Sequence, residues 1–158
     1  MYIEMSHVFV DRTALKTAVD AWIANSSTAE ATYGHIKTWD VSGVTDMNHL
    51  FYYCTTFNSD ISMWVVSAVT NMRYMFQAAT QFNQDISGWD VANVTTMEHM
   101  FTSYGSFDQD ISKWNVSSVT NYNGMTFNNL SWNNSQPIHK ITYNGIVYVP
   151  PYTFTDRS

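Results

Sequence analysis

Apolar and polar positions along this chain follow a unit that repeats every 25 residues. Tryptophan marks the period most clearly, and an isoleucine before it, two valines after it and a further apolar group recur with it. The four tryptophans are Trp39, Trp64, Trp89 and Trp114. A fixed period of about 20–50 residues is typical of solenoids, in which each repeat buries its apolar side only against its neighbours. The pattern therefore predicts stacked repeats with one continuous core.

Two local patterns alternate within each unit. Met72, Met75, Phe76 and Ala79 have the i, i+3, i+4, i+7 spacing of one helix face, and Thr70 precedes them as a candidate N-cap. Residues 82–87 then alternate apolar and polar, which is the period of a short strand. We therefore expect each unit to hold a strand, a bend through the tryptophan and a short helix.

These elements predict an α/β fold, a leucine-rich-repeat-like solenoid of four strand–helix coils whose strands stack in parallel about 4.8 Å apart. The chain would be a single solenoid domain over residues 1–158, with the repeats at 36–132. Residues 1–35 read as an N-terminal cap: a helix from Arg12 to about Ala24 capped by Asp11, then a short helix near Ser27. Residues 133–158 read as a C-terminal β-hairpin and tail, because Asn-Gly at 144–145 favours a type I′ turn.

Composition indicates which residue types form the surface and which classes of partner are excluded. Charged residues make up 13% of the chain and aromatic residues 16%, so the surface must consist largely of Asn, Ser, Thr and Gln. A formal net charge of −6 without a basic cluster argues against nucleic acid. No apolar stretch approaches the roughly 18 residues of a membrane span. Cys54 cannot form an internal disulfide, and we expect it to be a small buried thiol.

The repeat resembles that of a known family. The strings Trp89-Asp-Val-Ala-Asn-Val-Thr-Thr-Met-Glu-His-Met-Phe101 and Phe82-Asn-Gln-Asp-Ile-Ser-Gly-Trp89 look like the repeat of the BspA-like leucine-rich-repeat surface proteins, also found in mycoplasma surface lipoproteins. The resemblance covers about residues 34–132. It implies a leucine-rich-repeat-like fold, exposure on a cell or particle surface, and adhesive or recognition roles. It supplies no catalytic residue.

Three carboxylates recur at one repeat position, Asp60, Asp85 and Asp110. Neighbours about 4.8 Å apart repel each other, so something must offset the repulsion. Either each carboxylate is solvated or accepts backbone N–H bonds in the bend before the tryptophan, or a divalent cation bridges adjacent coils. In both cases the surrounding polar column should face outward and is the candidate binding site. It comprises Asn58, Asp60, Ser62, Asn83, Asp85, Ser87, Asp108, Asp110 and Ser112.

Other candidate chemistry is sparse. His49 and His99 share one repeat position, but two coils separate them by about 10 Å, too far to ligate one metal directly. We expect ordinary helix-face residues there, and we expect no metal site and no cofactor. No Ser/His/Asp or Cys/His constellation, phosphate loop or HExxH motif is present, so we expect no enzyme.

The sequence therefore favours a non-catalytic surface recognition or adhesion module, binding a protein or glycan on a surface. The alternative is a structural or decoration protein of a virion or other particle, whose partners would be copies of itself or a capsid or surface protein. No signal peptide is visible, and we expect an extracellular, cell-surface or virion-surface location without membrane insertion.

Overall fold

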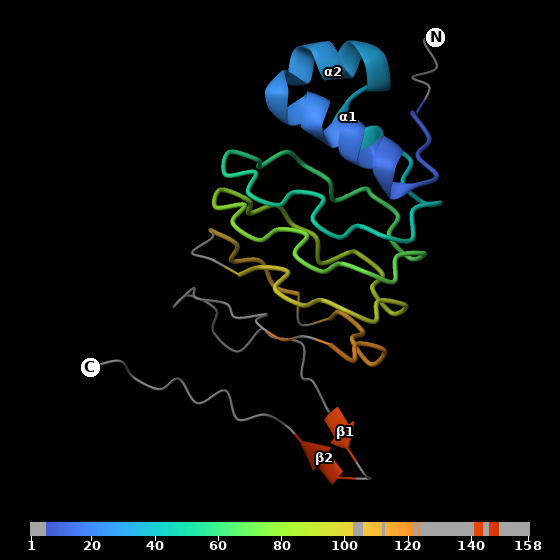
Figure 1. The fold of residues 1–158 in the computed structure, drawn as a ribbon, viewed down its shortest axis with the longest axis vertical. Helices are drawn as coiled ribbons and strands as arrows, with labels where there is room; N and C mark the ends of the chain where they lie inside the picture. Colours follow the sequence, from blue (N-terminus) through green and yellow to red (C-terminus); the bar gives the residue numbers. More distant parts are fainter. Residues whose placement is uncertain are drawn as a thin grey trace, which may run out of the picture.

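The computed structural model describes residues 6–102, 106–111, 113–121 and 123, and the strands at 141–143 and 146–148. Helices α1 (Arg12–Ala24) and α2 (Ser26–Tyr33) lie at one end of a stack of irregular coils (Figure 1). A short 3-10 helix, η1 (Ile36–Thr38), leads into the first coil. Strands β1 (Ile141–Tyr143) and β2 (Ile146–Tyr148) pair antiparallel, with Ile141 opposite Tyr148.

The N-terminal helices cover the first coil. The predicted helix from Arg12 to Ala24 is confirmed, and the Ala14 N–H donates to Asp11 Oδ1 at 2.9 Å. The short helix expected near Ser27 is α2, and Asn25 caps it: the Thr28 N–H donates to Asn25 Oδ1 at 3.1 Å. Helix α1 turns one apolar side toward the coils and buries Leu15, Ala18, Val19 and Trp22.

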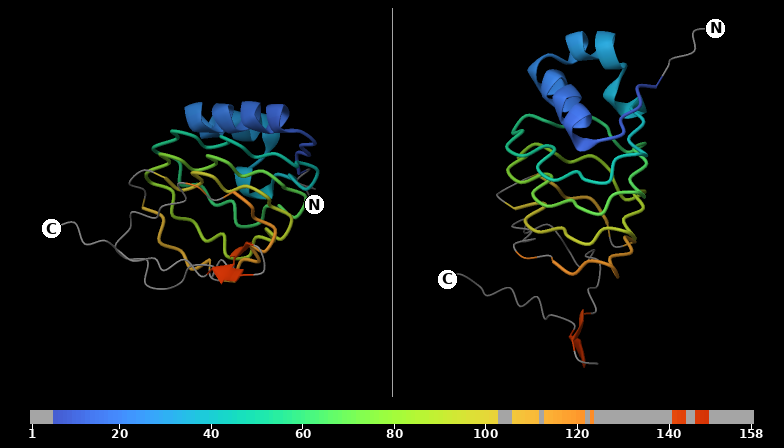
Figure 2. Two further views of the ribbon diagram at one scale, coloured as in Figure 1. Left: turned by 60° about the horizontal axis from the view of Figure 1, so that its bottom comes forward. Right: turned by 45° about the vertical axis from the view of Figure 1, so that its right-hand side comes forward.

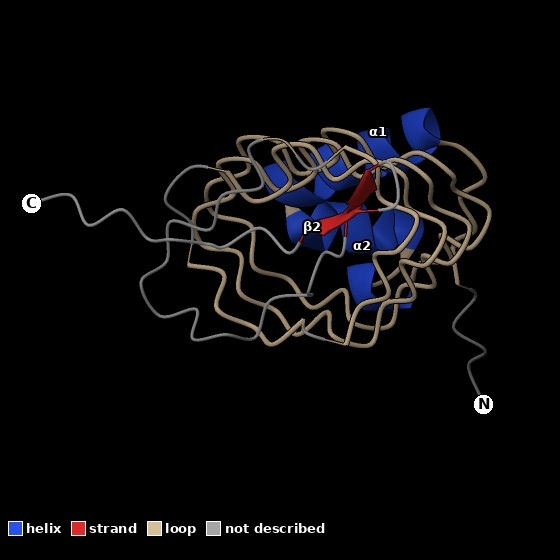
Figure 3. Cartoon of the chain, turned by 90° about the horizontal axis from the view of Figure 1, so that it is seen from below, coloured by secondary structure: helices blue, strands red, loops and turns tan. Residues whose placement is uncertain are grey.

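The repeats are not strand–helix coils, and the prediction of an α/β leucine-rich-repeat-like fold is wrong. Within the described part of the four units, η1 is the only helical piece and no strand forms. Turns and extended segments make up the coils, which appear in Figure 3 as tan loops, with the stack seen from below and the helices behind it. Single parallel bridges join successive coils through Asp46, Asn71, Thr96 and Asn121.

Residues 72–79 do not form the predicted helix, because two of them adopt a left-handed backbone conformation. Tyr74 and Ala78 have φ angles of 56° and 58°, in the left-handed region, so a right-handed helix cannot continue through them. Alternate N–H groups instead donate to the next coil: Met72, Tyr74, Phe76 and Ala78 bond to carbonyls 24 residues ahead at 2.8–3.0 Å. The apolar spacing that resembled one helix face is the inward face of a tight, repeated turn.

Thr70 is not a helix N-cap either. Its hydroxyl donates to the Thr45 carbonyl at 3.2 Å, and its N–H donates to the same oxygen at 2.8 Å. Thr95 repeats both bonds to the Thr70 carbonyl, and Thr120 repeats them to the Thr95 carbonyl. The threonine column therefore ties neighbouring coils together.

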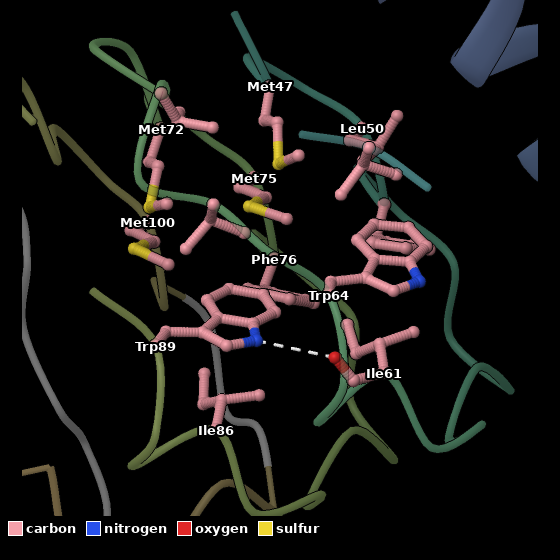
Figure 4. Close-up of a cluster of buried hydrophobic side chains, with 14 of the residues drawn as sticks. Met47, Leu50, Ile61, Trp64, Met72, Met75, Phe76, Ile86, Trp89 and Met100 are labelled. Carbon is pink, nitrogen blue, oxygen red and sulfur yellow. Dashed lines mark hydrogen bonds between the residues drawn. The ribbon is translucent and has the colours of Figure 1, made fainter. Parts of the chain in front are cut away.

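The coils lie one above another in Figure 2, and one continuous core of buried side chains runs through the stack; Figure 4 shows part of it. Each coil sends in the same set of side chains, so like residues pack on like residues along the axis. Phe51, Phe76 and Phe101 stack with centroids 5.2 and 5.6 Å apart. The Trp89 indole N–H donates to the Ile61 carbonyl of the preceding coil at 3.3 Å, the dashed line in Figure 4. Trp64 and Trp114 make the corresponding bonds.

Candidate binding surface

The aspartate column is held by the backbone of its own turns. The Ser62 N–H donates to Asp60 Oδ1, and the Ser87 N–H donates to Asp85 Oδ1, each at 2.9 Å. The hydrogen bond from the Ser87 side chain, followed by that from its backbone N–H, lowers the pKa of the Asp85 carboxyl below its usual value. Backbone hydrogen bonding, which was one of the two alternatives for the column, is present at Asp60 and Asp85.

Asp60 has an additional cationic partner. Lys37, from the preceding coil, places its Nζ 2.5 Å from Asp60 Oδ2. The hydrogen bond from Lys37, followed by those from Ser62, lowers the pKa of the Asp60 carboxyl to about 2. The carboxylate is therefore charged throughout the physiological range, and Lys37 offsets part of its repulsion with Asp85.

The asparagines of the predicted site are parts of the stack. Asn58 Oδ1 accepts from the Asn83 N–H at 2.9 Å and from Gln84 Nε2 at 3.0 Å. Asn83 Oδ1 accepts from the Asp108 N–H at 2.8 Å and from Gln109 Nε2 at 2.9 Å. These side-chain carbonyls act where a strand would use backbone carbonyls, which explains why an alternating segment forms no strand.

The predicted column is thus brought together at the surface but is largely engaged in holding the coils. Asn58, Asp60, Ser62, Asn83, Asp85, Ser87, Asp108 and Asp110 are all exposed or half-buried. Ser112 lies outside the described residues. Among the residues that the structure places, no group of three or more His, Cys, Asp and Glu could hold a metal ion.

A second surface column consists of rings. His49, Tyr74 and His99 stack along the coil axis with centroids 4.7 and 5.0 Å apart. The sequence predicted that these positions lie on a helix face, and this prediction is wrong. Their φ angles are 56°, 56° and 54°, in the left-handed region. Arg73 lies beside the column, with Cζ 4.7 Å from the Tyr74 centroid and Nε 2.8 Å from Glu98 Oε2.

Burial first, then the charges of Arg12 and Arg73, lower the pKa of His49, so its neutral form is favoured. The two guanidinium groups thus favour an uncharged imidazole at His49.

Two tyrosines extend from the first coil beside this column. Tyr52 and Tyr53 are 41% and 63% exposed, and their ring centroids are 4.6 Å apart. Tyr53 also has a left-handed backbone, with φ at 58°. The equivalent residues of the next coil are Gln77 and Ala78, so the fold requires no aromatic ring at either position. The sequence analysis did not predict this pair. Its signal in the sequence is the difference between Tyr52–Tyr53 and the residues at the same positions of the next coil, Gln77 and Ala78.

Cys54 follows this pair and is half-buried rather than fully buried. Burial raises the pKa of its thiol above the usual value, which disfavours the reactive thiolate. The cysteine therefore behaves as a packing residue beside the tyrosines.

The repeat identifies a family. A sequence model described as "Mycoplasma protein of unknown function, DUF285" matches residues 24–140. The chain belongs to this family. The match begins at the end of α1 and spans the described coils, so the 25-residue unit is the part of the chain that carries the relationship. No curated protein and no solved structure matches the chain. No helix in the described ranges is long and apolar enough to cross a membrane.

Proposed function

We propose that this DUF285 chain is a non-catalytic surface recognition or adhesion module that binds a protein or glycan through side chains exposed on a rigid stack. The exposed pair Tyr52 and Tyr53 carries the proposal. The left-handed backbone of Tyr53 costs about 1–2 kcal/mol of folding free energy, and its exposed ring recovers little of this by packing. Tyrosine is enriched at recognition surfaces because it offers large, rigid, amphipathic contact area.

Two further observations support recognition. Family membership agrees with the resemblance of the repeat to BspA-like surface proteins, for which adhesive roles are expected. The interlocked threonine and asparagine columns hold the coils in one register, which fixes the positions of exposed side chains. A preorganised surface loses less conformational freedom when it binds. We propose a location on the outside of a cell or particle.

The repeat supplies a matched test. Tyr52→Gln with Tyr53→Ala installs the residues of the next coil, where Ala78 adopts the same φ of 58°. We expect the labelled wild-type chain to bind cultured epithelial cells saturably in flow cytometry. The double variant should lose at least about tenfold in affinity while its unfolding midpoint does not fall. Protease-treated and glycosidase-treated cells separate protein from glycan partners. Absence of saturable binding, or equal binding by the variant, contradicts the proposal.

A further inference from the structure

The second coil breaks the repeat at a different part of the surface. Met63 and Val65 are 61% and 56% exposed, although Trp64 between them and Val66 after them are buried. The other coils place Thr38, Gly88 and Lys113 at the position of Met63, and Asp40, Asp90 and Asn115 at that of Val65. Only this coil presents two adjacent apolar side chains to solvent at these positions.

Val65 also gives up a turn contact that the other coils make. The Ser42 N–H donates to Asp40 Oδ1 at 3.0 Å, the Ala92 N–H to Asp90 Oδ1 at 3.1 Å, and the Ser117 N–H to Asn115 Oδ1 at 3.2 Å. Valine has no side-chain oxygen with which to accept from Ser67. The substitution therefore loses a stabilising bond and exposes an apolar side chain, a local conflict with folding that is expected at functional sites.

The surroundings of this pair are open and acidic. Trp39 stacks on Trp64 at 6.3 Å, and Trp89 bonds to Ile61, so the register brings Asp40 and Asp90 beside Val65 on the adjacent coils. Gly88 follows Met63 in its column, and a Cβ there would meet no atom within 4 Å, which leaves space beside Met63. Val8 is 58% exposed and pairs with Asp40, so exposed valines lie on both sides of that carboxylate.

We propose that Met63 and Val65 bind an extended basic protein segment that carries an apolar anchor residue. The anchor would cover Met63 and Val65, and its Lys or Arg neighbours would face Asp40 and Asp90. Lys37, which is paired with Asp60, and Lys113 are the cations nearby in the register. A second copy, a nucleic acid or an anionic membrane would meet like charge at this acidic surface of a chain with net charge −6. Aliphatic Met and Val also lack the flat aromatic face on which sugars stack.

This inference rests on the proposed recognition function but not on the tyrosine pair. The probe is a short fluorescein-labelled peptide with a central Leu flanked by Lys, compared with the same peptide carrying Ser at the centre and with a Glu-flanked Leu peptide. In fluorescence polarisation with the full chain, we expect the Lys–Leu peptide to bind best, at least about tenfold more tightly than either control. Raising NaCl from about 0.01 M to about 1 M, which shortens the Debye length from about 30 Å to about 3 Å, should weaken it.

Two variants locate the contact. Met63→Thr with Val65→Asn keeps the net charge, installs residues of the first and fourth coils, and restores an acceptor for Ser67. It should lose the preference for Leu over Ser while its melting temperature stays equal or rises. Asp40→Asn with Asp90→Asn retains the turn acceptors of Ser42 and Ala92 and should weaken both Lys peptides alike. Tyr52→Gln with Tyr53→Ala is the control and should bind the Lys–Leu peptide as the wild type does.

Equal binding of the Leu and Ser peptides, preference for the Glu peptide, no binding of the Lys–Leu peptide, or unchanged binding by the Met63/Val65 variant would each overturn the inference. If the Lys–Leu peptide binds as expected while the tyrosine variant retains full cell binding, the proposed role of the tyrosines fails and this surface stands.

Discussion

At the scale of single residues, short polar side chains hold the coils where backbone ladders would be expected. Asp60 and Asp85 accept from serines two residues ahead, and Asn58 and Asn83 accept from the next coil. Each such bond contributes about 0.5–1.5 kcal/mol net. A surface rich in these residues is therefore not automatically a binding surface.

Asp60→Asn tests the ion pair with Lys37. Asn keeps the acceptor for Ser62 but removes the charge, so at pH 7 we expect a loss in unfolding free energy below about 1 kcal/mol, since the Asp60 side chain is 35% exposed. The pKa of Asp60 is lowered from 3.8 to about 2, so its contribution is present above pH 4 and lost as pH falls toward 2.

Urea unfolding at stepped pH measures this effect. The unfolding free energies of the wild type and of Asp60→Asn should converge as pH falls from 4 toward 2. Asp85 is not paired with Lys37, so Asp85→Asn should lower the unfolding free energy at pH 7 by less than Asp60→Asn does. A constant gap between wild type and Asp60→Asn down to pH 2 would contradict the assignment.

At the scale of elements, the sequence predicted some features and missed others for identifiable reasons. Helix α1 was predictable because Asp11 and the apolar spacing are local signals. The inward set was predictable because the period repeats it, and Trp39, Met72 and Ile86 are buried as expected. The turn at residues 71–79 was not, because left-handed φ angles at Tyr74 and Ala78 are not signalled by those residue types.

Part of the candidate site was not predicted, because the prediction relied on residues that recur in every unit and not on residues that differ between units. The aspartate column was correctly expected at the surface, yet the repeat uses it for its own turns. Four exposed residues differ from those at the same positions of the next coil, and the repeat fold does not require them: Tyr52, Tyr53, Met63 and Val65. Comparison of the four units position by position would have found them.

Trp89→Ala tests the core at this scale. The indole is 4% exposed, stacks on Trp114 at 6.4 Å and donates to Ile61, so its removal should cost at least about 3 kcal/mol in unfolding free energy. Trp89→Phe, which keeps a ring but no donor, should cost less. Chemical denaturation measures both changes, and a loss below about 1 kcal/mol for Trp89→Ala would place the ring outside the core.

At the scale of the whole molecule, like residues stack on like residues through all the described coils. Threonine, asparagine and aromatic columns each tie one coil to the next, so each inner coil is held by both neighbours. Such a stack keeps its exposed side chains at fixed spacing. We interpret the regular columns as scaffold and the coil-specific residues as the recognition surface.

The most direct test of that division is a coil-exchange scan. Each exposed residue of the first two coils is replaced by the residue at the same position of the next coil, and binding to epithelial cells is measured together with the unfolding midpoint. We predict that exchanges at Tyr52, Tyr53, Met63 and Val65 reduce binding without lowering the midpoint, and that exchanges elsewhere, apart from Asp40 beside Val65, leave binding unchanged. Loss of binding only where the midpoint also falls, or loss concentrated at exposed positions other than these, would contradict this prediction.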